Sequence, residues 1–277
     1  MKILPQIITS RANPTVKWLA SLSEKKGREK AKCFIAEGEK LAIEAGETGL
    51  PVSHLVVAEG KMERLIPLLR EAFSAQQYEQ LPLIVLSDEV FSKASTEMAP
   101  QGVICVIKYL DFFERMDIIY KEDFCFNTDE RIMVLASVRD PSNIGAVIRS
   151  AVAFGVDRIV MSSDCADVYN PKVIRAAMGS IFKVKITIVL SLADFVRVFR
   201  ECGRRIFAAE LTDNALPLSA VSLSRSDAVI IGNEGHGIPT EVSALCNASV
   251  YIPISSKTES LNASVAASVF MWEQSKG

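Results

Sequence analysis

The sequence has few of the residues from which metal and hydrolytic sites are commonly built. Histidine occurs only twice, as His54 and His236, and no two of the six cysteines form a C-x-x-C pair. Metal and redox motifs need such closely spaced ligands. The chain also lacks the G-x-S-x-G nucleophile turn, the G-x-x-x-x-G-K-[S/T] phosphate loop and the G-x-G-x-x-G dinucleotide fingerprint. We therefore expect no metal site, no serine-hydrolase site and no standard nucleotide-binding loop.

Long hydrophobic runs are also absent. No run reaches the ~18 apolar residues that a membrane span needs. The first residues, MKILPQIITSRANP, are interrupted by Pro5 and Gln6 and contain no small-residue cleavage site. We expect neither a membrane segment nor a secretory signal. The scattered cysteines are interpreted as reduced thiols, which predicts a cytoplasmic location.

The net charge of −2 points to no partner, but the charges are unevenly distributed. Residues 1–40 contain nine Lys or Arg and four Glu, whereas residues 111–130 contain seven acids and two basic residues. A basic N-terminal segment can bind phosphate groups. A solvated helical face explains the same charges equally well, so composition leaves both interpretations open.

The order of apolar runs and helical patterns predicts an α/β protein with two α/β domains. Strands are expected at 32–38, 53–60, 81–88, 102–109, 131–138, 157–163, 184–190, 204–211, 227–233 and 249–255. The clearest helical patterns are NIGAVIRSAVAFG (143–155) and LNASVAASVFMWEQ (261–274). Residues 111–130 show no clean period. We therefore expect a first domain at 1–110, a linker at 111–130 and a second domain at 131–277.

Polar residues follow several of the expected strands in the second half. Asn143 stands where a helix cap is expected, and Arg149 lies in the apolar helical stretch that follows. Glu234 lies within the glycine-rich GNEGHG, and Ser260 and Asn262 precede the last helix. Ligands of open α/β sheets bind at the carboxyl ends of strands, so these residues predict a concave polar site. Each alone is also a common cap or turn residue.

Three sequence blocks, NIGAVIRSA, IIGNEGHGIP and IPISSKTESLNASVAASVFMWE, resemble the ordered motifs of the SpoU (TrmH-like) RNA ribose 2′-O-methyltransferases of the SPOUT superfamily. The first half, with ITSRANPTVKWLASL and CFIAEGEKL, resembles the substrate-binding extension of that family. The resemblance implies a parallel sheet with a C-terminal trefoil knot. It also implies a homodimer that uses S-adenosylmethionine and modifies RNA, with rRNA favoured over tRNA as the substrate.

The resemblance also implies a role for particular residues. The catalytic residues it indicates are Asn143, Arg149, Glu234, Ser260 and Asn262. The cofactor-binding residues it indicates are Leu211, Gly232, Asn233, Gly235, Gly237, Ile252, Ile254 and Leu261. The basic segment adds candidate RNA-binding residues, namely Arg11, Lys17, Lys25, Lys26 and Arg28. Because a guanidinium stays charged in proteins, Arg149 is expected to bind phosphate and a developing alkoxide rather than to act as a base.

Two other functions are compatible with the sequence. One is a catalytically inactive RNA-binding or ribosome assembly factor, against which the presence of Arg149, Glu234, Ser260 and Asn262 argues. The other is an unrelated α/β enzyme that binds a small acidic metabolite through Arg149. Such an enzyme has no use for the basic segment at residues 1–40. An active RNA methyltransferase is therefore the favoured hypothesis.

Overall fold

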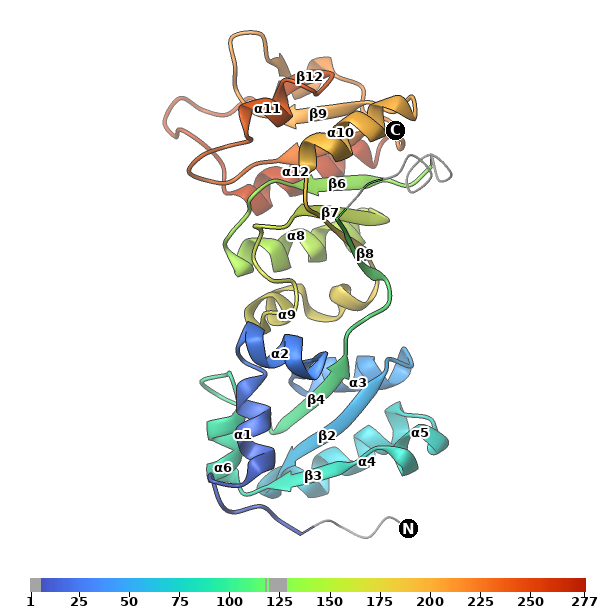
Figure 1. Cartoon of the computed structure of the whole chain (residues 1–277), viewed down its shortest axis with the longest axis vertical. Coiled ribbons are helices and arrows are strands. Elements are labelled where there is room, and N and C mark those ends of the chain that lie inside the picture. The colour runs from blue at the N-terminus through green and yellow to red at the C-terminus, as the bar shows by residue number, and fades with distance from the viewer. Residues whose placement is uncertain (1–5, 118, 120–128) are drawn as a thin grey trace. The chain divides into compact units, whose positions relative to one another are not determined.

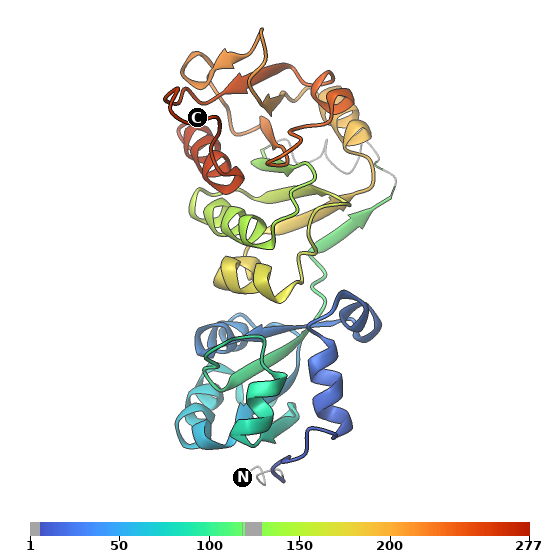
Figure 2. The same ribbon diagram turned by 90° about the vertical axis from the view of Figure 1, so that its left-hand side faces the viewer.

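The computed structural model describes residues 6–117, 119 and 129–277. The described residues pack into two compact units, each with its own sheet (Figures 1 and 2). The first unit contains the described residues up to Leu110 together with Asp167–Phe182. The second contains the described residues of 111–166 and 183–277. A short segment from the second half of the sequence thus packs with the first unit.

The first unit is built around a four-stranded mixed sheet. Its strands are β1 (Cys33–Glu37), β2 (Val52–Ala58), β3 (Leu83–Leu86) and β4 (Val103–Lys108). Its helices are α1 (Pro14–Ser21), α2 (Lys25–Ala31), α3 (Glu39–Glu47), η1 (Glu59–Lys61), α4 (Met62–Ala72), α5 (Ala75–Gln80), α6 (Asp88–Ala94), α9 (Pro171–Ala177) and η2 (Met178–Phe182). The strand order is β1-β4-β2-β3. β4 is antiparallel to both neighbours, and β3 runs parallel to β2.

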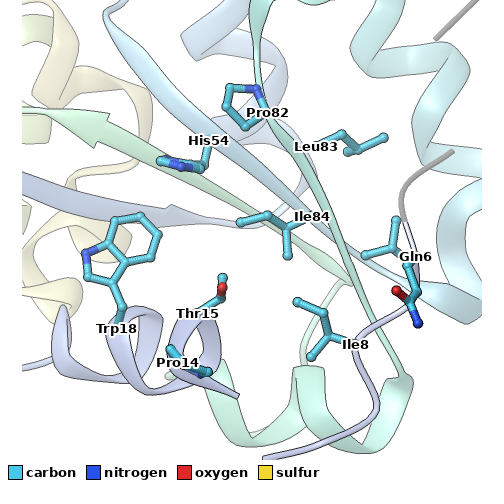
Figure 3. Close-up of a pocket in the computed structure, with 10 residues that line it drawn as sticks. Gln6, Ile8, Pro14, Thr15, Trp18, His54, Pro82, Leu83 and Ile84 are labelled. Carbon is cyan, nitrogen blue, oxygen red and sulfur yellow. The ribbon is translucent and has the colours of Figure 1, made fainter. Parts of the chain in front are cut away.

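Helix α1 begins where its sequence provides both a cap and a proline. The Asn13 side chain accepts a hydrogen bond from the Thr15 N–H at 2.8 Å, and Pro14 occupies the first turn, where no N–H is needed. Buried apolar residues of α1 and α6 then pack in one cluster against the sheet. A pocket remains between α1 and β3, and Trp18 and His54 are among the residues that line it (Figure 3).

Arg28 of α2 is held in the interior of the first unit, only 1% exposed. Its Nη2 lies 2.5 Å from Asp167 Oδ2. Its Nη1 donates to the carbonyl oxygens of Leu22 and Ser23 at 2.9 and 2.7 Å. A buried guanidinium is tolerated when its charge is paired and its donors are hydrogen-bonded, as they are here. This ion pair fixes Asp167, and with it the start of the 167–182 segment, to the first unit.

Aromatic and backbone contacts hold the same segment further along. Tyr169 stacks on Tyr109 with ring centroids 4.1 Å apart, and its hydroxyl accepts a hydrogen bond from the Leu110 N–H at 2.9 Å. At Gly179 a Cβ atom would lie 1.5 Å from the Glu44 carboxylate, so only glycine allows this approach. Helix α9 therefore belongs structurally to the unit formed mainly by the N-terminal residues.

The second unit contains an eight-stranded parallel sheet. Its strands are β5 (Phe113–Met116), β6 (Ile132–Leu135), β7 (Arg158–Ser162), β8 (Lys185–Val189), β9 (Ile206–Ala209), β10 (Leu216–Pro217), β11 (Ala228–Ile231) and β12 (Ala248–Tyr251). Its helices are α8 (Pro141–Ala153), α10 (Leu192–Glu201), η3 (Leu218–Ala220), α11 (Thr240–Ser243) and α12 (Ala263–Gln274). The order is β10-β12-β9-β11-β6-β7-β8-β5, and all neighbours are parallel.

Helices cover both faces of this sheet. Phe195 and Phe199 of α10 pack on Ile132 and Val134 of β6 in one buried cluster. Helices α8 and α12 lie side by side on the other face (Figure 2). Burial on both faces explains why the central strands are continuous apolar runs such as AVII in β11.

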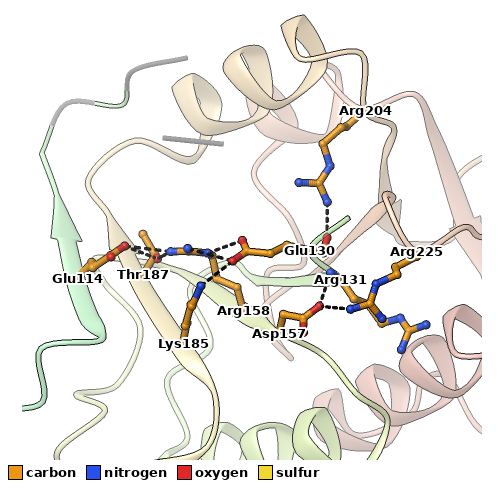
Figure 4. A network of polar contacts seen from close by, with 9 residues as sticks. All are labelled: Glu114, Glu130, Arg131, Asp157, Arg158, Lys185, Thr187, Arg204 and Arg225. Atoms are coloured by element: carbon orange, nitrogen blue, oxygen red, sulfur yellow. Dashed lines mark hydrogen bonds and ion pairs between the residues drawn. The ribbon is translucent and has the colours of Figure 1, made fainter. Parts of the chain in front are cut away.

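An ionic network centred on the buried Arg158 and Glu130 joins the edge strand β5 to its neighbours (Figure 4). Arg158 donates to Glu130 at 2.9 Å, to Glu114 at 2.9 Å and to the Thr187 hydroxyl at 2.7 Å. Lys185 Nζ lies 3.0 Å from the other Glu130 oxygen. Burial alone would raise the pKa of Glu130, but the hydrogen bonds from Arg158 and Lys185 lower it below its usual value. The ionised Glu130 carboxylate thus ties β7 and β8 to the segment before β6, and Arg158 ties β5 to them through Glu114.

The α/β class and all ten predicted strands are confirmed, each within a few residues of its predicted position. The linker predicted at 111–130 is wrong for Phe113–Met116, which form β5. Residues 118 and 120–128 of that stretch lie outside the described residues. The division into domains at 110 and 130 stays a prediction, as does the trefoil knot.

The cysteines differ in one respect from the expectation. Cys33, Cys105, Cys165 and Cys246 are free thiols, whereas Cys202 is disulfide-bonded. The prediction that all the cysteines are reduced is therefore wrong for Cys202. Cys125 lies outside the described residues.

The helices of the described residues are short. The longest, α8, has 13 residues. A bilayer-spanning helix needs about 20 predominantly apolar residues. Over residues 6–117, 119 and 129–277, no helix has the length and apolar composition required to cross a membrane.

Replacement of Arg28 tests the anchoring of the 167–182 segment. We expect Arg28→Ala to lower the free energy of unfolding by about 3 kcal/mol, because it leaves Asp167 and two carbonyl groups without their donor. Lys26→Ala, on the exposed side of the same helix, is the matched control and should change stability little. Urea denaturation of both variants measures the difference, and equal stabilities would contradict the assignment.

Candidate active site at the carboxyl edge of the parallel sheet

The order of the parallel sheet brings two distant loops to one place. On one side of β6 lie β7 and then β8, whereas on its other side lie β11 and then β9. The strand order therefore reverses at the β6–β11 pair, and in open α/β sheets ligands bind at such a switch point. Ile231 of β11 is paired with Leu135 of β6, so the residues that follow both strands emerge at the same edge.

The loop after β11 is a tight turn tied to the loop after β6. Asn233 and Gly237 exchange backbone hydrogen bonds of 3.1 and 2.9 Å. The Asn233 side chain accepts from the Gly235 and His236 N–H groups at 2.9 and 3.1 Å. Its Nδ2 donates to the Ser137 carbonyl at 2.8 Å. Asn233 thus shapes the turn and fixes it to the neighbouring loop.

The backbone of residues 237–238 lies close against Gly232. A Cβ atom there would lie 2.5 Å from the carbonyl carbon of Gly237 and 2.7 Å from the Ile238 nitrogen. At Gly235 the nearest atom to an added Cβ is Asn233 Oδ1 at 3.5 Å, which is ordinary contact. Gly232 is therefore required by the folding of the loop, and the structure gives Gly235 no such constraint.

Asn143, Glu234 and Asn262 form one hydrogen-bonded set from three separate segments. The Asn143 amide donates to the Glu234 carboxylate, and Asn143 Oδ1 accepts from Asn262 Nδ2 at 2.9 Å. Asn262 also caps α12, because its Oδ1 accepts from the Ser264 N–H at 2.9 Å. The three residues that the sequence placed after different strands thus meet at one point.

The cap of α8 differs from the prediction. Asp140 is the N-cap, and its carboxylate accepts from the Ser142 N–H at 2.7 Å. Asn143 lies within the helix and is buried, with 7% exposure. Its amide is free to bind Glu234 and Asn262 because the capping role is taken by Asp140.

Arg149 lies on the exposed side of α8, between the buried Ile148 and Ala151. Within the described part of the chain, no hydrogen bond or ion pair involves its guanidinium. It lies six residues after Asn143, about 9 Å further along the helix axis. Its five N–H donors are thus available to a ligand such as phosphate.

A pocket of about 520 Å³ lies at the carboxyl ends of β9 and β12, beside the segment that leads to α12. Five predicted site residues line it, namely Leu211, Ile252, Ile254, Ser260 and Leu261. The four predicted residues of the β11 loop, Gly232, Asn233, Gly235 and Gly237, are not among its lining residues. The structure therefore brings together only part of the predicted cofactor set.

The sequence prediction missed two carboxylates of this pocket, Glu210 and Glu259, and no lysine or arginine side chain lines it. Glu210 accepts a hydrogen bond from the Ser249 hydroxyl at 2.7 Å. Its place directly after an apolar strand was the signal available in the sequence. Two carboxylates with no basic residue among the lining residues make the pocket suited to a cationic ligand.

The predicted RNA-binding residues of the first unit have different surroundings. Arg11 pairs with Glu89 at 2.5 Å on the surface, and Lys25 lies 3.9 Å from Glu29. Lys17 and Lys26 are exposed. Arg28 is buried, as described above, so its assignment to RNA phosphate is wrong. The exposed lysines remain candidates.

No group of three His, Cys, Asp or Glu side chains with metal-binding geometry occurs among the residues that the structure describes. The polar atoms of the site are amides, carboxylates, hydroxyls and one guanidinium. This donor set suits hydrogen bonding to an organic ligand.

Two family models match the chain. The SpoU rRNA Methylase family matches residues 130–272, and the MRM3-like substrate binding domain matches residues 13–105. The first match contains the Asn143–Glu234–Asn262 set, Arg149 and the pocket. The second contains the exposed Lys17 and Lys26.

Relatives of known name and structure resemble the chain over nearly its whole length. The 23S rRNA (guanosine(2553)-2′-O)-methyltransferase RlmP of Bacillus subtilis is 30% identical over 265 residues, which cover 96% of this chain and 97% of the relative. The AdoMet-bound rRNA methyltransferase from Sinorhizobium meliloti has a TM-score of 0.80 and 26% identity, and the match covers 98% of this chain and 97% of that structure. The SpoU methyltransferase AviRb from Streptomyces viridochromogenes, also in complex with AdoMet, has a TM-score of 0.77 and 25% identity. This match covers 95% of this chain and 98% of that structure.

Alanine substitutions at two glycines test the origin of the loop's shape. We expect Gly232→Ala to lower the free energy of unfolding by about 1–3 kcal/mol, because the added methyl group must displace the backbone of residues 237–238. Gly235→Ala in the same turn should change it by less than about 0.5 kcal/mol. Chemical denaturation of both variants measures this difference. Equal effects would show that the contact at Gly232 does not determine the turn.

Proposed function

This chain belongs to the SpoU rRNA methylase family, and we propose that it transfers a methyl group from S-adenosylmethionine to the 2′-hydroxyl of a ribose in structured RNA. One observation carries the proposal. The Asn143–Glu234–Asn262 set lies at the switch point of a parallel sheet whose β9 and β12 border an apolar pocket lined by carboxylates. The relative from Sinorhizobium meliloti has AdoMet bound in the same fold.

The pocket suits this cofactor in both shape and charge. Leu211, Ile252, Ile254 and Leu261 offer apolar surface to an adenosine group, and the peptide groups between them offer donors and acceptors. Glu210 and Glu259 provide negative charge for a ligand that carries a sulfonium and an ammonium group. These residues would hold the cofactor, which supplies an electrophilic methyl group when bound.

Arg149 and the amide set have separate tasks in the proposed reaction. The Arg149 fork can grip a phosphate beside the reacting ribose with two parallel hydrogen bonds. It also stabilises the negative charge that develops on the 2′-oxygen as its proton passes to solvent water. Asn143 donates to Glu234, and Asn262 orients Asn143, so the carboxylate keeps one position in the loop. Positioning of this kind lowers the barrier of an in-line displacement.

Ribosomal RNA is the proposed substrate, with tRNA the less favoured one. The support is the printed activity of the Bacillus subtilis relative, which matches the chain from end to end. The cytoplasm is the proposed location because ribosomal RNA is found there. The cysteines do not support this location, since Cys202 is disulfide-bonded.

A homodimer is the proposed assembly. Helix α12 is apolar nearly all around, although only one side of it packs on the sheet and α8. Val265 and Trp272 of this helix are 48% and 53% exposed. A second copy of the chain covering this face would remove both from water. Sedimentation of the purified protein measures the assembly directly.

The pocket assignment predicts a selective loss of cofactor affinity. Ile254→Lys places an ammonium group in the apolar pocket, where it occupies volume and repels a cationic ligand, so S-adenosylmethionine should bind at least tenfold more weakly. Leu190→Lys changes an exposed apolar residue of the same unit outside the pocket and should bind normally. Calorimetry with a chelator present measures both. Equal cofactor affinities of the two variants would contradict the assignment of the cofactor to this pocket.

The role of Arg149 predicts a loss of turnover without a loss of folding. Arg149→Lys keeps the charge but loses the planar fork, so methyl transfer should fall by about two orders of magnitude, and Arg149→Ala should be at least as impaired. Melting temperature and cofactor affinity should stay close to those of the unchanged protein, because the side chain is exposed. Transfer of labelled methyl to RNA is the assay. Near-normal turnover in both variants would show that Arg149 has no part in the reaction.

A further inference from the structure

The first unit contains a pocket of about 550 Å³ that none of the residues assigned above explains (Figure 3). It lies between α1, the edge strand β3 and the segment that precedes α1. Trp18, His54, Pro82 and Ile84 are among the residues that line it, and Thr15 adds a hydroxyl group. No carboxylate, lysine or arginine side chain lines it. The pocket is thus uncharged and rich in flat surfaces.

Two aromatic rings form one end of this pocket. The Trp18 and His54 rings contact each other edge to face, with centroids 4.9 Å apart and planes at 61°. Both side chains are only partly buried, and Figure 3 shows them bordering the open space. Burial lowers the pKa of His54, which favours the uncharged ring. A partly exposed indole beside a neutral imidazole is a surface on which another flat ring can stack.

The helix that borders this uncharged pocket also carries a basic residue. Lys17 adjoins Trp18 on α1, is exposed, and has no ion pair within the described residues. Glu89, an acid at the start of the neighbouring α6, is already paired with Arg11 at 2.5 Å. An uncharged aromatic pocket bordered by a helix that carries an exposed lysine complements a nucleotide, which joins a flat neutral base to an anionic phosphate. An apolar peptide has no use for that cation.

We propose that the pocket between α1 and β3 binds an unpaired nucleobase of the RNA substrate, stacked on Trp18, with the adjoining phosphate at Lys17. The site is separate from the methyl-transfer site, and only the identity of the RNA as a substrate rests on the proposed function. The match of residues 13–105 to a substrate-binding domain covers Trp18, His54 and β3. Stacking tolerates every base, so the site provides affinity for a single-stranded segment rather than a particular sequence.

The tryptophan content allows a direct test. The chain has two tryptophans, so Trp272→Phe leaves Trp18 as the only one without changing the pocket. Titration of this variant with single-stranded hexanucleotides of uridine and of adenosine should quench the Trp18 fluorescence to saturation. RNA binding without quenching would overturn the proposal. Equal quenching by an apolar peptide that displaces the RNA would also overturn it, because the groove would then be a peptide site.

Variants separate stacking from phosphate binding. Trp18→Ala should weaken binding of the hexanucleotides by roughly tenfold and leave the salt dependence unchanged, whereas Trp18→Phe should recover part of the affinity. Lys17→Ala should keep the quenching but reduce the slope of log affinity against log salt by about one. Unchanged affinity in folded Trp18→Ala would contradict the proposal.

A different outcome would overturn the proposed function alone. Absence of methyl transfer to any RNA, with quenching at Trp18 intact, would leave the nucleobase pocket standing. Normal methyl transfer with no quenching would overturn the nucleobase pocket and leave the proposed function standing. The two readouts come from different units of the protein, so the two failures are distinguishable.

Discussion

The two hydrogen bonds of the Asn143 side chain are the contacts on which the rest of the candidate site depends. Asn143 is buried, so both polar atoms of its amide require partners. The nitrogen donates to Glu234 and the oxygen accepts from Asn262. These partners lie in the β11 loop and at the start of α12. The parallel pairing of β6 with β11 brings the β11 loop to α8, and the packing of α12 on α8 brings the start of α12 there. One buried amide therefore joins the three segments that carry the family's motifs.

The distribution of charge separates residues that hold the fold from residues that remain for ligands. Arg28 and Arg158 are basic, but their donors are engaged by Asp167 and by Glu130 and Glu114. They fix the 167–182 segment and the edge strand β5, respectively. Arg149 and Lys17, by contrast, are exposed and have no ion pair among the residues that the structure describes. Basic residues of the same type thus serve opposite purposes according to burial.

The strands could be predicted from the sequence because burial on both faces leaves continuous apolar runs, as in AVII of β11. The meeting of Asn143, Glu234 and Asn262 was indicated by their positions after strands and by the family resemblance. Asn143 was mistaken for a cap although Asp140 and Pro141 carry the usual signal of a helix start. The local sequence was therefore sufficient to predict the correct helix start.

Other features had no local signal. Arg28 is buried by a partner 139 residues away, and nothing in KKGREKA distinguishes it from the exposed Lys26. β5 is four residues long, carries charges at Glu114 and Arg115, and is a strand only because it pairs with β8. Both depend on contacts between distant parts of the chain, which composition and periodicity do not report.

The central claim is that this protein methylates a ribose of ribosomal RNA at its 2′-oxygen. Mapping of 2′-O-methylated nucleotides in RNA from cells with and without the protein tests it most directly. The account predicts that at least one ribosomal 2′-O-methyl group disappears with the protein and returns when the unchanged chain is supplied, but not when Arg149→Ala is supplied. Identical 2′-O-methylation of ribosomal RNA in both cells would contradict it.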